Sequence, residues 1–303
     1  MKKEKVNRSP LFYVGDKYKI VSEIKSHFPP AINRFIEPFV GGGSVYLNVP
    51  ANQYLLNDID RNVIDIHRFL CSYSNNVQEF YTLLFSIIHK YGLSCSYEAD
   101  SVPDELKQRY KKTYYAHYNR HNFNKLKTNY NHSAERSVAE LYVLLIYGFN
   151  RMLRFNNQGN YNLPVGNVDF NINVYNALSN YFELNKSKSV EWSCSDFEVF
   201  LKSVKYKHDD FIYLDPPYLL TFSEYNKLWN EDTESKLLQT LDRLHGQGVN
   251  FAISNVTCYK GLENKLFIDW SLKYKVHQIK SNYISYHDNT IKKFNEVLVT
   301  NYI

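Results

Sequence analysis

Two hydrophobic patterns alternate along most of the chain. Short apolar runs typical of buried strands end in polar or glycine residues, at 34–40, 54–56, 190–192, 211–214 and 249–255. Apolar positions with helical spacing lie between them, at 18–28, after Val45, at 63–67 and at 232–244. Strands that alternate with helices predict an α/β fold with a doubly wound, mostly parallel sheet. Ligands of such sheets bind outside the carboxyl ends of the strands.

Residues 67–168 interrupt this alternation. Helical spacing dominates there, as at 80–88 and 139–147, and the segment is dense in Lys, Arg, His, Asn and Tyr. We therefore expect a catalytic domain formed by residues 1–66 and 169–303, with a mainly helical subdomain inserted at 67–168. The last apolar run, at 296–300, predicts an antiparallel edge strand.

Composition narrows the class of protein. The 303 residues are 44% hydrophobic and 16% aromatic, which supports a true core and excludes a disordered or fibrous chain. A net charge of +5 is compatible with a polyanionic partner, but it is common among soluble enzymes. Four widely spaced cysteines show no ligand pattern, so we expect a reduced protein without a metal site. No apolar run approaches the length of a membrane span, and we expect a cytoplasmic location.

A glycine run predicts a cofactor site. Gly41, Gly42 and Gly43 follow the first strand and allow a tight turn and close approach of a ligand. Asp58 ends the next strand, where an acid can bind the ribose hydroxyls of a nucleoside cofactor. Since the dinucleotide and phosphate-loop patterns are both missing, S-adenosylmethionine fits better than NAD or ATP. Lys17 is suited to pair with a carboxylate of this cofactor. A helix N-cap role for Asp58 and a surface position for Lys17 are the simpler alternatives.

The most distinctive motif is Asp215, Pro216, Pro217 and Tyr218, which follows the apolar run at 211–214. The prolines fix the backbone and remove two donors, so the carbonyl groups are left for a ligand. The acid accepts hydrogen bonds and the tyrosine offers a flat face. The motif predicts a binding site for a planar group with an exocyclic amine, such as adenine.

Residues 148–166 predict a β-hairpin. Its turn lies at 156–159, and basic, amide and aromatic residues flank it. Such a hairpin can enter a DNA groove, where arginine reads guanine and apolar groups meet thymine methyls. A solvated basic hairpin is the alternative.

These motifs in this order resemble one enzyme family. The run FYVGDK at 12–17, EPFVGGGS at 37–44, the acid Asp58, an insertion and the Asp-Pro-Pro-Tyr motif are similar to Dam-type DNA adenine-N6 methyltransferases of the D12 class, alpha group. The stretches 23–29 and 217–227 extend the likeness over nearly the whole chain, and the bacteriophage branch is the most similar. The resemblance implies a class I methyltransferase fold and a site-specific enzyme of a bacterial cell or phage-infected host, located with the nucleoid. It would transfer the methyl group of S-adenosylmethionine to N6 of an adenine flipped out of double-stranded DNA, within GATC.

The resemblance also implies roles for single residues in the catalytic domain. The cofactor contacts would be Tyr13, Lys17, Phe39, Gly41, Gly43, Asp58, Phe197 and Asp215. The catalytic residues would be Asp215, Pro216, Pro217 and Tyr218. Asp215 and the Pro216 carbonyl would accept hydrogen bonds from the amine, while Tyr218 stacks on the base.

In the hairpin, the resemblance implies contacts with DNA. Arg154 would read a guanine, Met152 and Pro164 would contact a thymine, and Phe149 and Asn150 would act where the target base leaves the stack.

Three departures from the family leave selectivity at the outer base pair open. Phe12 stands where some members have a guanine-contacting lysine, Tyr115 stands where others have an arginine, and Arg151 replaces a small residue. The sequence also leaves open an RNA substrate, a longer DNA site, a DNA-binding regulator that has lost catalysis, and dimerisation on DNA. The missing phosphate motifs argue against a dehydrogenase or kinase.

Overall fold

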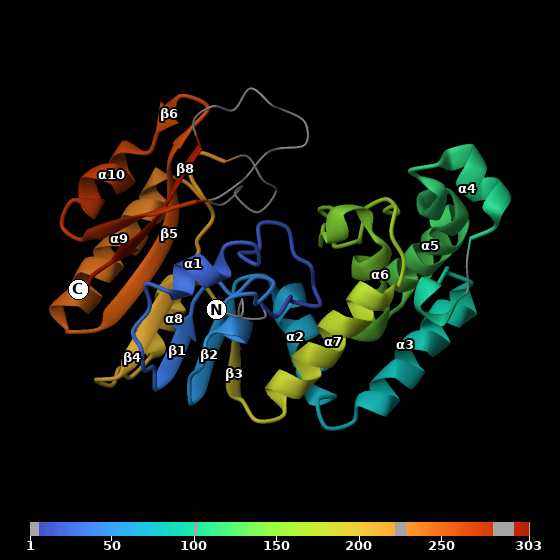
Figure 1. Ribbon diagram of the computed structural model, residues 1–303, viewed down its shortest axis with the longest axis horizontal. Coiled ribbons are helices and arrows are strands. Elements are labelled where there is room, and N and C mark those ends of the chain that lie inside the picture. Colours follow the sequence, from blue (N-terminus) through green and yellow to red (C-terminus); the bar gives the residue numbers. More distant parts are fainter. Residues whose placement is uncertain (1–5, 100–101, 222–228, 281–293, 303) are drawn as a thin grey trace, which may run out of the picture.

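A single mixed β-sheet is the centre of the protein (Figure 1). The computed structural model describes residues 6–99, 102–221, 229–280 and 294–302. Seven strands lie side by side in the order β3 (Ser189–Cys194), β2 (Gln53–Asp58), β1 (Arg34–Glu37), β4 (Asp210–Leu214), β5 (Asn250–Tyr259), β8 (Phe294–Thr300) and β7 (Lys275–Ile279). The first five are parallel, β8 is antiparallel to both its neighbours, and the short β6 (Leu262–Glu263) pairs with β5. The predicted mostly parallel, doubly wound fold is confirmed.

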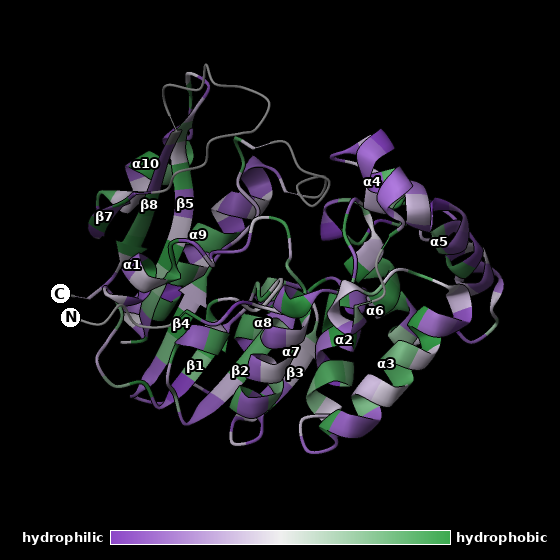
Figure 2. Cartoon of the chain, turned by 45° about the vertical axis from the view of Figure 1, so that its right-hand side comes forward, coloured by the Kyte–Doolittle hydropathy of each residue, from purple (hydrophilic) through white to green (hydrophobic). Residues whose placement is uncertain are grey.

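Helices cover both faces of this sheet. Because successive strand residues point to opposite faces, Phe35 and Phe211 belong to one apolar layer while Ile36 and Ile212 belong to the other. The first layer includes α1 (Val21–Lys25), α2 (Arg61–Ser72) and α7 (Ile172–Asn185). The second includes α8 (Phe197–Ser203), α9 (Glu231–Gly246) and α10 (Lys265–Ser271). Burial on both faces explains why β1 and β4 appear in the sequence as apolar runs. The apolar residues of the sheet are green in Figure 2.

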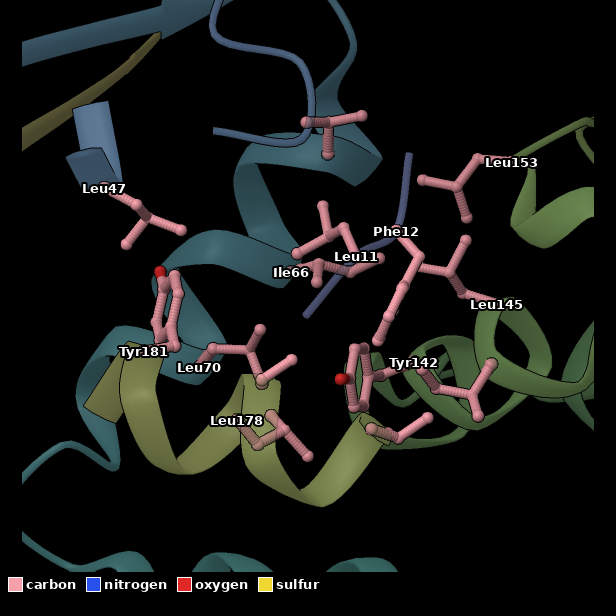
Figure 3. Packing of buried hydrophobic residues seen from close by; sticks show 14 of the residues in the cluster. Leu11, Phe12, Leu47, Ile66, Leu70, Tyr142, Leu145, Leu153, Leu178 and Tyr181 are labelled. Carbon is pink, nitrogen blue, oxygen red and sulfur yellow. The ribbon is translucent and has the colours of Figure 1, made fainter. Parts of the chain in front are cut away.

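The remaining helices lie beyond β3, opposite α9 and α10 in Figure 1. They are α3 (Val77–Tyr91), α4 (Asp104–Tyr110), α5 (Tyr114–His132) and α6 (Val138–Tyr147), and short 3₁₀ turns at Ser96–Glu98 and Phe149–Arg151 accompany them. The apolar helix α6 packs against α2, α3 and α5. Figure 3 shows Leu11 and Phe12 of the N-terminal segment beside Ile66 of α2 and Leu145 of α6. The helical part therefore shares one apolar cluster with the sheet, and the predicted boundary after residue 66 falls inside α2.

Three predicted elements differ from the structure. β8 is antiparallel as predicted, but it is an inner strand, because β7 covers its other edge. Most of β7 is exposed, which gave its sequence no strand pattern. The helix expected after Val45 is one 3₁₀ turn, Tyr46–Asn48, since Val49 precedes a proline and is extended. The helix expected at 18–28 is regular only over α1.

The stretch 222–228, which contributes to the family resemblance, lies outside the described residues. Among the helices that the structure describes, none has the length and apolar character needed to cross a membrane.

Candidate active site

A cavity of about 640 Å³ opens at the carboxyl ends of β1, β2 and β4. The connection after β1 leads to β2 on one side, whereas the connection after β4 leads to β5 on the other side, and the crevice between two such strands is the usual ligand position in this architecture. The cavity wall contains every residue predicted for the cofactor and for catalysis: Tyr13, Lys17, Phe39, Gly41, Gly43, Asp58, Phe197, Asp215, Pro216, Pro217 and Tyr218. The structure thus brings these residues together, and their individual roles remain predictions.

The buried Asn57 holds the strand ends that form this cavity. Its Nδ2 donates to the carbonyl oxygens of Pro38 (3.0 Å) and Ser195 (2.9 Å), and its Oδ1 accepts from the Ser195 amide (3.1 Å). These bonds connect the carboxyl ends of β1, β2 and β3. The cavity is therefore bounded by a rigid edge of the sheet.

The glycine run adopts a backbone that other residues rarely reach. Gly41 and Gly43 have φ values of +48° and +76°. A Cβ on Gly42 would lie 2.6 Å from the Cβ of Tyr13, so the loop and Tyr13 pack directly on each other. The Nε2 of buried His67 lies 2.9 Å from the Gly41 carbonyl oxygen, which can only accept. Burial lowers the pKa of His67 to about 4, so a neutral ring donates this bond.

Asp58 connects the glycine loop to the next strand. Its Oδ2 accepts from the Gly41 amide (2.8 Å) and its Oδ1 from the Asp60 amide (2.9 Å). Burial raises the pKa of Asp58 to about 6, in spite of these bonds. The N-cap of α2 is Asp60, whose side chain accepts from the Asn62 amide, so the N-cap alternative for Asp58 is wrong. Each carboxylate oxygen keeps a second acceptor site for a ligand.

Four charged and hydroxyl side chains meet at the Asp-Pro-Pro-Tyr motif. Lys17 Nζ lies 2.7 Å from Asp215 Oδ2 and 3.7 Å from Glu296 Oε1. The Tyr218 hydroxyl lies 2.9 Å from both Asp215 Oδ1 and Glu296 Oε1. We call Lys17, Asp215, Tyr218 and Glu296 the Asp215 cluster. Lys17 and Glu296 are only 4% and 1% exposed, so the surface alternative for Lys17 is wrong.

Glu296 was not predicted from the sequence. It lies on β8, which enters the sheet from the far end of the chain. The available signal was an acid within the otherwise apolar run that ends in Val297, Leu298 and Val299. A buried acid in an apolar strand requires a partner, and this partner is the motif on β4.

An aromatic wall bounds the cavity on the side of the second apolar layer. The ring centroid of Phe39 lies 5.5 Å from that of Phe197 and 5.7 Å from that of Trp229. The centroids of Phe197 and Trp229 are 5.9 Å apart. Trp229, which sequence reasoning missed, completes a surface suited to a purine ring.

Glu37 at the end of β1 supplies an unsatisfied acceptor. It is buried, it contributes to the cavity wall, and its Oε2 has no hydrogen-bond partner in the described part of the chain. Burial, with Asp215 and Asp58 nearby, raises the pKa of Glu37 well above its usual range. A positively charged amine of a ligand at this position would favour the ionised form of Glu37 and supply a donor to its Oε2. The residues present thus fit S-adenosylmethionine, which has a nucleoside and an amino-acid end.

The predicted hairpin is present without regular strands. Antiparallel bridges join Gly148 to Val165 and Phe155 to Tyr161, and Asn156 closes the turn by accepting from the amides of Gln158 and Asn160. The side chains predicted to contact DNA are exposed or partly exposed: Phe149, Asn150, Met152, Arg154 and Pro164. Arg154 Nε donates to Asn162 Oδ1 across the hairpin (2.8 Å).

Comparison with known proteins agrees with this geometry. The family described as "D12 class N6 adenine-specific DNA methyltransferase" matches residues 13–284. The chain belongs to this family. Its members transfer methyl groups, and S-adenosylmethionine is the methyl donor of this family and fold.

Relatives of two lengths match the D12-class chain. "Type II methyltransferase M.FokI" of Planomicrobium okeanokoites is 36% identical over 97% of this chain and 43% of the relative. "Modification methylase StsI" of Streptococcus sanguinis is 34% identical over 99% and 43%. "DNA adenine methylase" of Escherichia coli (strain K12) is 26% identical over 97% and 95%. The chain therefore spans less than half the length of the first two relatives.

Proposed function

We propose that this D12-class protein transfers a methyl group from S-adenosylmethionine to N6 of an adenine flipped out of double-stranded DNA. The observation that carries the proposal is the single cavity shared by the glycine loop, Asp58 and the Asp-Pro-Pro-Tyr motif. The methyl donor and the acceptor can then be held together in this cavity, where alignment of the reacting groups provides much of the rate enhancement. Flipping the base costs a few kcal/mol of stacking and pairing.

Specific side chains would hold the cofactor. Asp58 would accept from the ribose hydroxyls, and the wall of Phe39, Phe197 and Trp229 would contact the adenine ring, since all four residues line the cavity. Glu37 offers its unsatisfied oxygen to the amine. When bound, the cofactor supplies an electrophilic methyl group on its sulfonium.

The Asp215 cluster would hold the target base. The Tyr218 hydroxyl has one proton and two acceptors at the same distance, on Asp215 and Glu296. If it donates to Glu296, Asp215 Oδ1 becomes available to the exocyclic amine without movement of the hydroxyl oxygen. Asp215 and the Pro216 carbonyl then aim the nitrogen lone pair at the methyl group, while the Tyr218 ring stacks on the base.

Replacement of Glu296 by glutamine is expected to lower kcat by about tenfold, the value of one charge-assisted hydrogen bond. The neutral amide binds the Tyr218 hydroxyl less strongly, so this hydroxyl competes with the adenine amine for Asp215. Cofactor affinity, measured by calorimetry, should not change. In a Tyr218→Phe background the same substitution should cost much less, because no hydroxyl remains to compete. Additive effects in this cycle would contradict the proposed exchange.

The hairpin and the neighbouring helices would recognise DNA. We propose that residues 67–168 act as the recognition part, with α2 shared between it and the catalytic part formed by 1–66 and 169–303. Arg154 would read a guanine, Met152 and Pro164 a thymine, and Phe149 and Asn150 would act beside the flipped base. Phe149 is 49% exposed, which is unusual for a phenylalanine and suits a contact with bases. The proposed site is GATC.

Replacement of Arg154 by alanine is expected to reduce discrimination at one guanine of the site by about 10–100-fold. Arg154 is held by Asn162, which orients its guanidinium for bidentate contact. The measurement compares kcat/KM on GATC duplexes with duplexes changed at single positions. Arg243→Ala on the exposed face of α9, outside the proposed recognition part, is the matched control. Equal loss on every duplex would assign Arg154 to the phosphate backbone instead.

The direct test of the proposed function is methyl incorporation from labelled S-adenosylmethionine into duplex DNA. Incorporation into duplexes with GATC, at N6 of adenine, is the expected result. Incorporation into RNA or cytosine, or none into DNA, would contradict the proposal.

A further inference from the structure

Two residues that depart from the family pattern contact each other. The guanidinium carbon of Arg151 lies 3.9 Å from the centroid of the Phe12 ring. Phe12 is 7% exposed and packs among apolar side chains such as Leu145 and Leu153 (Figure 3), so its ring is a fixed platform. The guanidinium of Arg8 lies 4.6 Å from the same centroid. Two cations therefore share one aromatic ring.

The buried Nε of Arg151 has no hydrogen-bond partner in the described part of the chain. No ion pair to the Arg151 guanidinium is present among those same residues. Burial, together with the nearby charge of Arg8, lowers the pKa of Arg151 to about 10. An arginine has five N–H donors in a rigid fork, and leaving a buried one such as Nε unsatisfied is costly. This arrangement is typical of a site at which a bound ligand supplies the hydrogen-bond acceptor.

The backbone on both sides of the contact is strained. Phe12, Asn150 and Arg151 have φ values of +49°, +53° and +50°, which side-chain-bearing residues rarely adopt. Such strain persists only where the surrounding structure enforces it, and it concentrates at functional sites. The bond from the Phe149 amide to the Pro164 carbonyl and the close approach of Gly166 to Gly148 enforce it here. The position of the Arg151 guanidinium is thus tightly fixed.

The contact lies beside the cavity. Phe12 precedes Tyr13, which contributes to the cavity wall and packs on the glycine loop. Arg151 follows Phe149 and Asn150, the residues proposed to act where the base leaves the stack. A group that meets Arg151 therefore lies on the side of the cavity where the target base is proposed to leave the stack.

We propose that Arg151, stacked on Phe12, reads the guanine adjacent to the target adenine. This proposal rests on the proposed function, because it requires DNA methylation to be measured. The planar fork of arginine matches the O6 and N7 acceptors of guanine bidentately, and stacking on Phe12 fixes the plane of the fork. Exposed cations suffice for phosphate contacts, and Arg8 is such a cation. The proposed GATC site has a guanine in the required position.

The test uses the full chain and a library of duplexes that fixes one adenine and randomises its flanks. Methylation is read by sequencing for the wild type, Arg151→Lys, Arg151→Ala and Phe12→Leu. The lysine variant retains the charge but loses the planar fork, and the leucine variant retains an apolar side chain but loses the platform. All three variants should lose about 10–100-fold of the preference for guanine beside the adenine and keep their preferences elsewhere. Arg243→Lys, on the remote helix α9, should match the wild type.

Each other result overturns the proposal. If Arg151→Lys retains the preference, Arg151 contacts a phosphate. The same conclusion follows if Arg151→Ala lowers the methylation of all duplexes equally and reduces the slope of log binding constant against log salt concentration by about 1. If the wild type methylates DNA with no preference at this position, no residue reads it. A wild type that methylates no DNA would instead contradict the proposed function. Calorimetric binding of S-adenosylmethionine shows that each variant is folded, and Arg151→Lys replaces any variant that is not.

Discussion

Replacement of Asp215 by alanine is expected to lower the rate of methyl transfer by about 10²–10³-fold. Asp215 is the acceptor proposed to orient the amine of the flipped adenine, and it also positions Lys17 and Tyr218. Its removal leaves Lys17 with Glu296 as a charged partner, so the variant should stay folded. Single-turnover transfer of labelled methyl groups from S-adenosylmethionine to duplex DNA measures the effect on chemistry alone.

Asp209→Ala is the matched control for this experiment. Asp209 lies just before β4, at the opposite end of the strand from Asp215, and its carboxylate is exposed beside His208. It should transfer methyl groups at the wild-type rate. Near-normal transfer by the Asp215 variant would contradict its assignment as a catalytic residue.

Replacement of Asp58 by asparagine is expected to weaken the binding of S-adenosylmethionine by about 10–100-fold. The proposed ribose contact would lose its charge, and the bond that holds the Gly41 amide would weaken too. Calorimetry on the folded variant gives the dissociation constant. Asp65→Asn, on the exposed side of α2 beside Arg61 and Arg68, is the control and should bind normally.

The pKa of Asp58 adds a pH test. The carboxylate form accepts hydrogen bonds from the ribose, and protonation removes that acceptor. Since burial raises this pKa to about 6, half of the Asp58 side chains are protonated near pH 6, and the part of wild-type affinity that depends on Asp58 should fall as the pH decreases through this value. The asparagine variant should lose that pH dependence. An unchanged affinity in the variant, or the same pH profile, would exclude Asp58 from the cofactor contact.

The strand-end motifs could be located from the sequence because local chemistry determines them. The glycine run and Asp215 follow apolar runs that are buried on both faces, and parallel strands bring their carboxyl ends to one edge. Asp58 on the neighbouring strand reaches the same edge for the same reason. These elementary rules were sufficient to place the cavity.

The contacts that complete the site depend on packing between distant segments. Glu296 reaches the motif only because β8 inserts between β5 and β7, and the exposed β7 left no pattern from which to predict this insertion. The contact of Phe12 with Arg151 requires the N-terminal segment to pack against the hairpin. The hairpin was expected to have regular strands, but Asn150 and Arg151 have strained, positive φ values and only isolated bridges join its two sides. Neither hydrophobic periodicity nor secondary-structure propensity along the sequence predicts such contacts.

The most direct test of the central claim is sequencing that maps N6-methyladenine in DNA from cells that express the chain and carry no other adenine methyltransferase. The account predicts that methylation appears at adenines within GATC and is absent when Asp215→Ala is expressed. Methylation at a different recurring site would reject GATC and retain the adenine chemistry. N6-methyladenine no more abundant than in the Asp215→Ala cells would contradict the account.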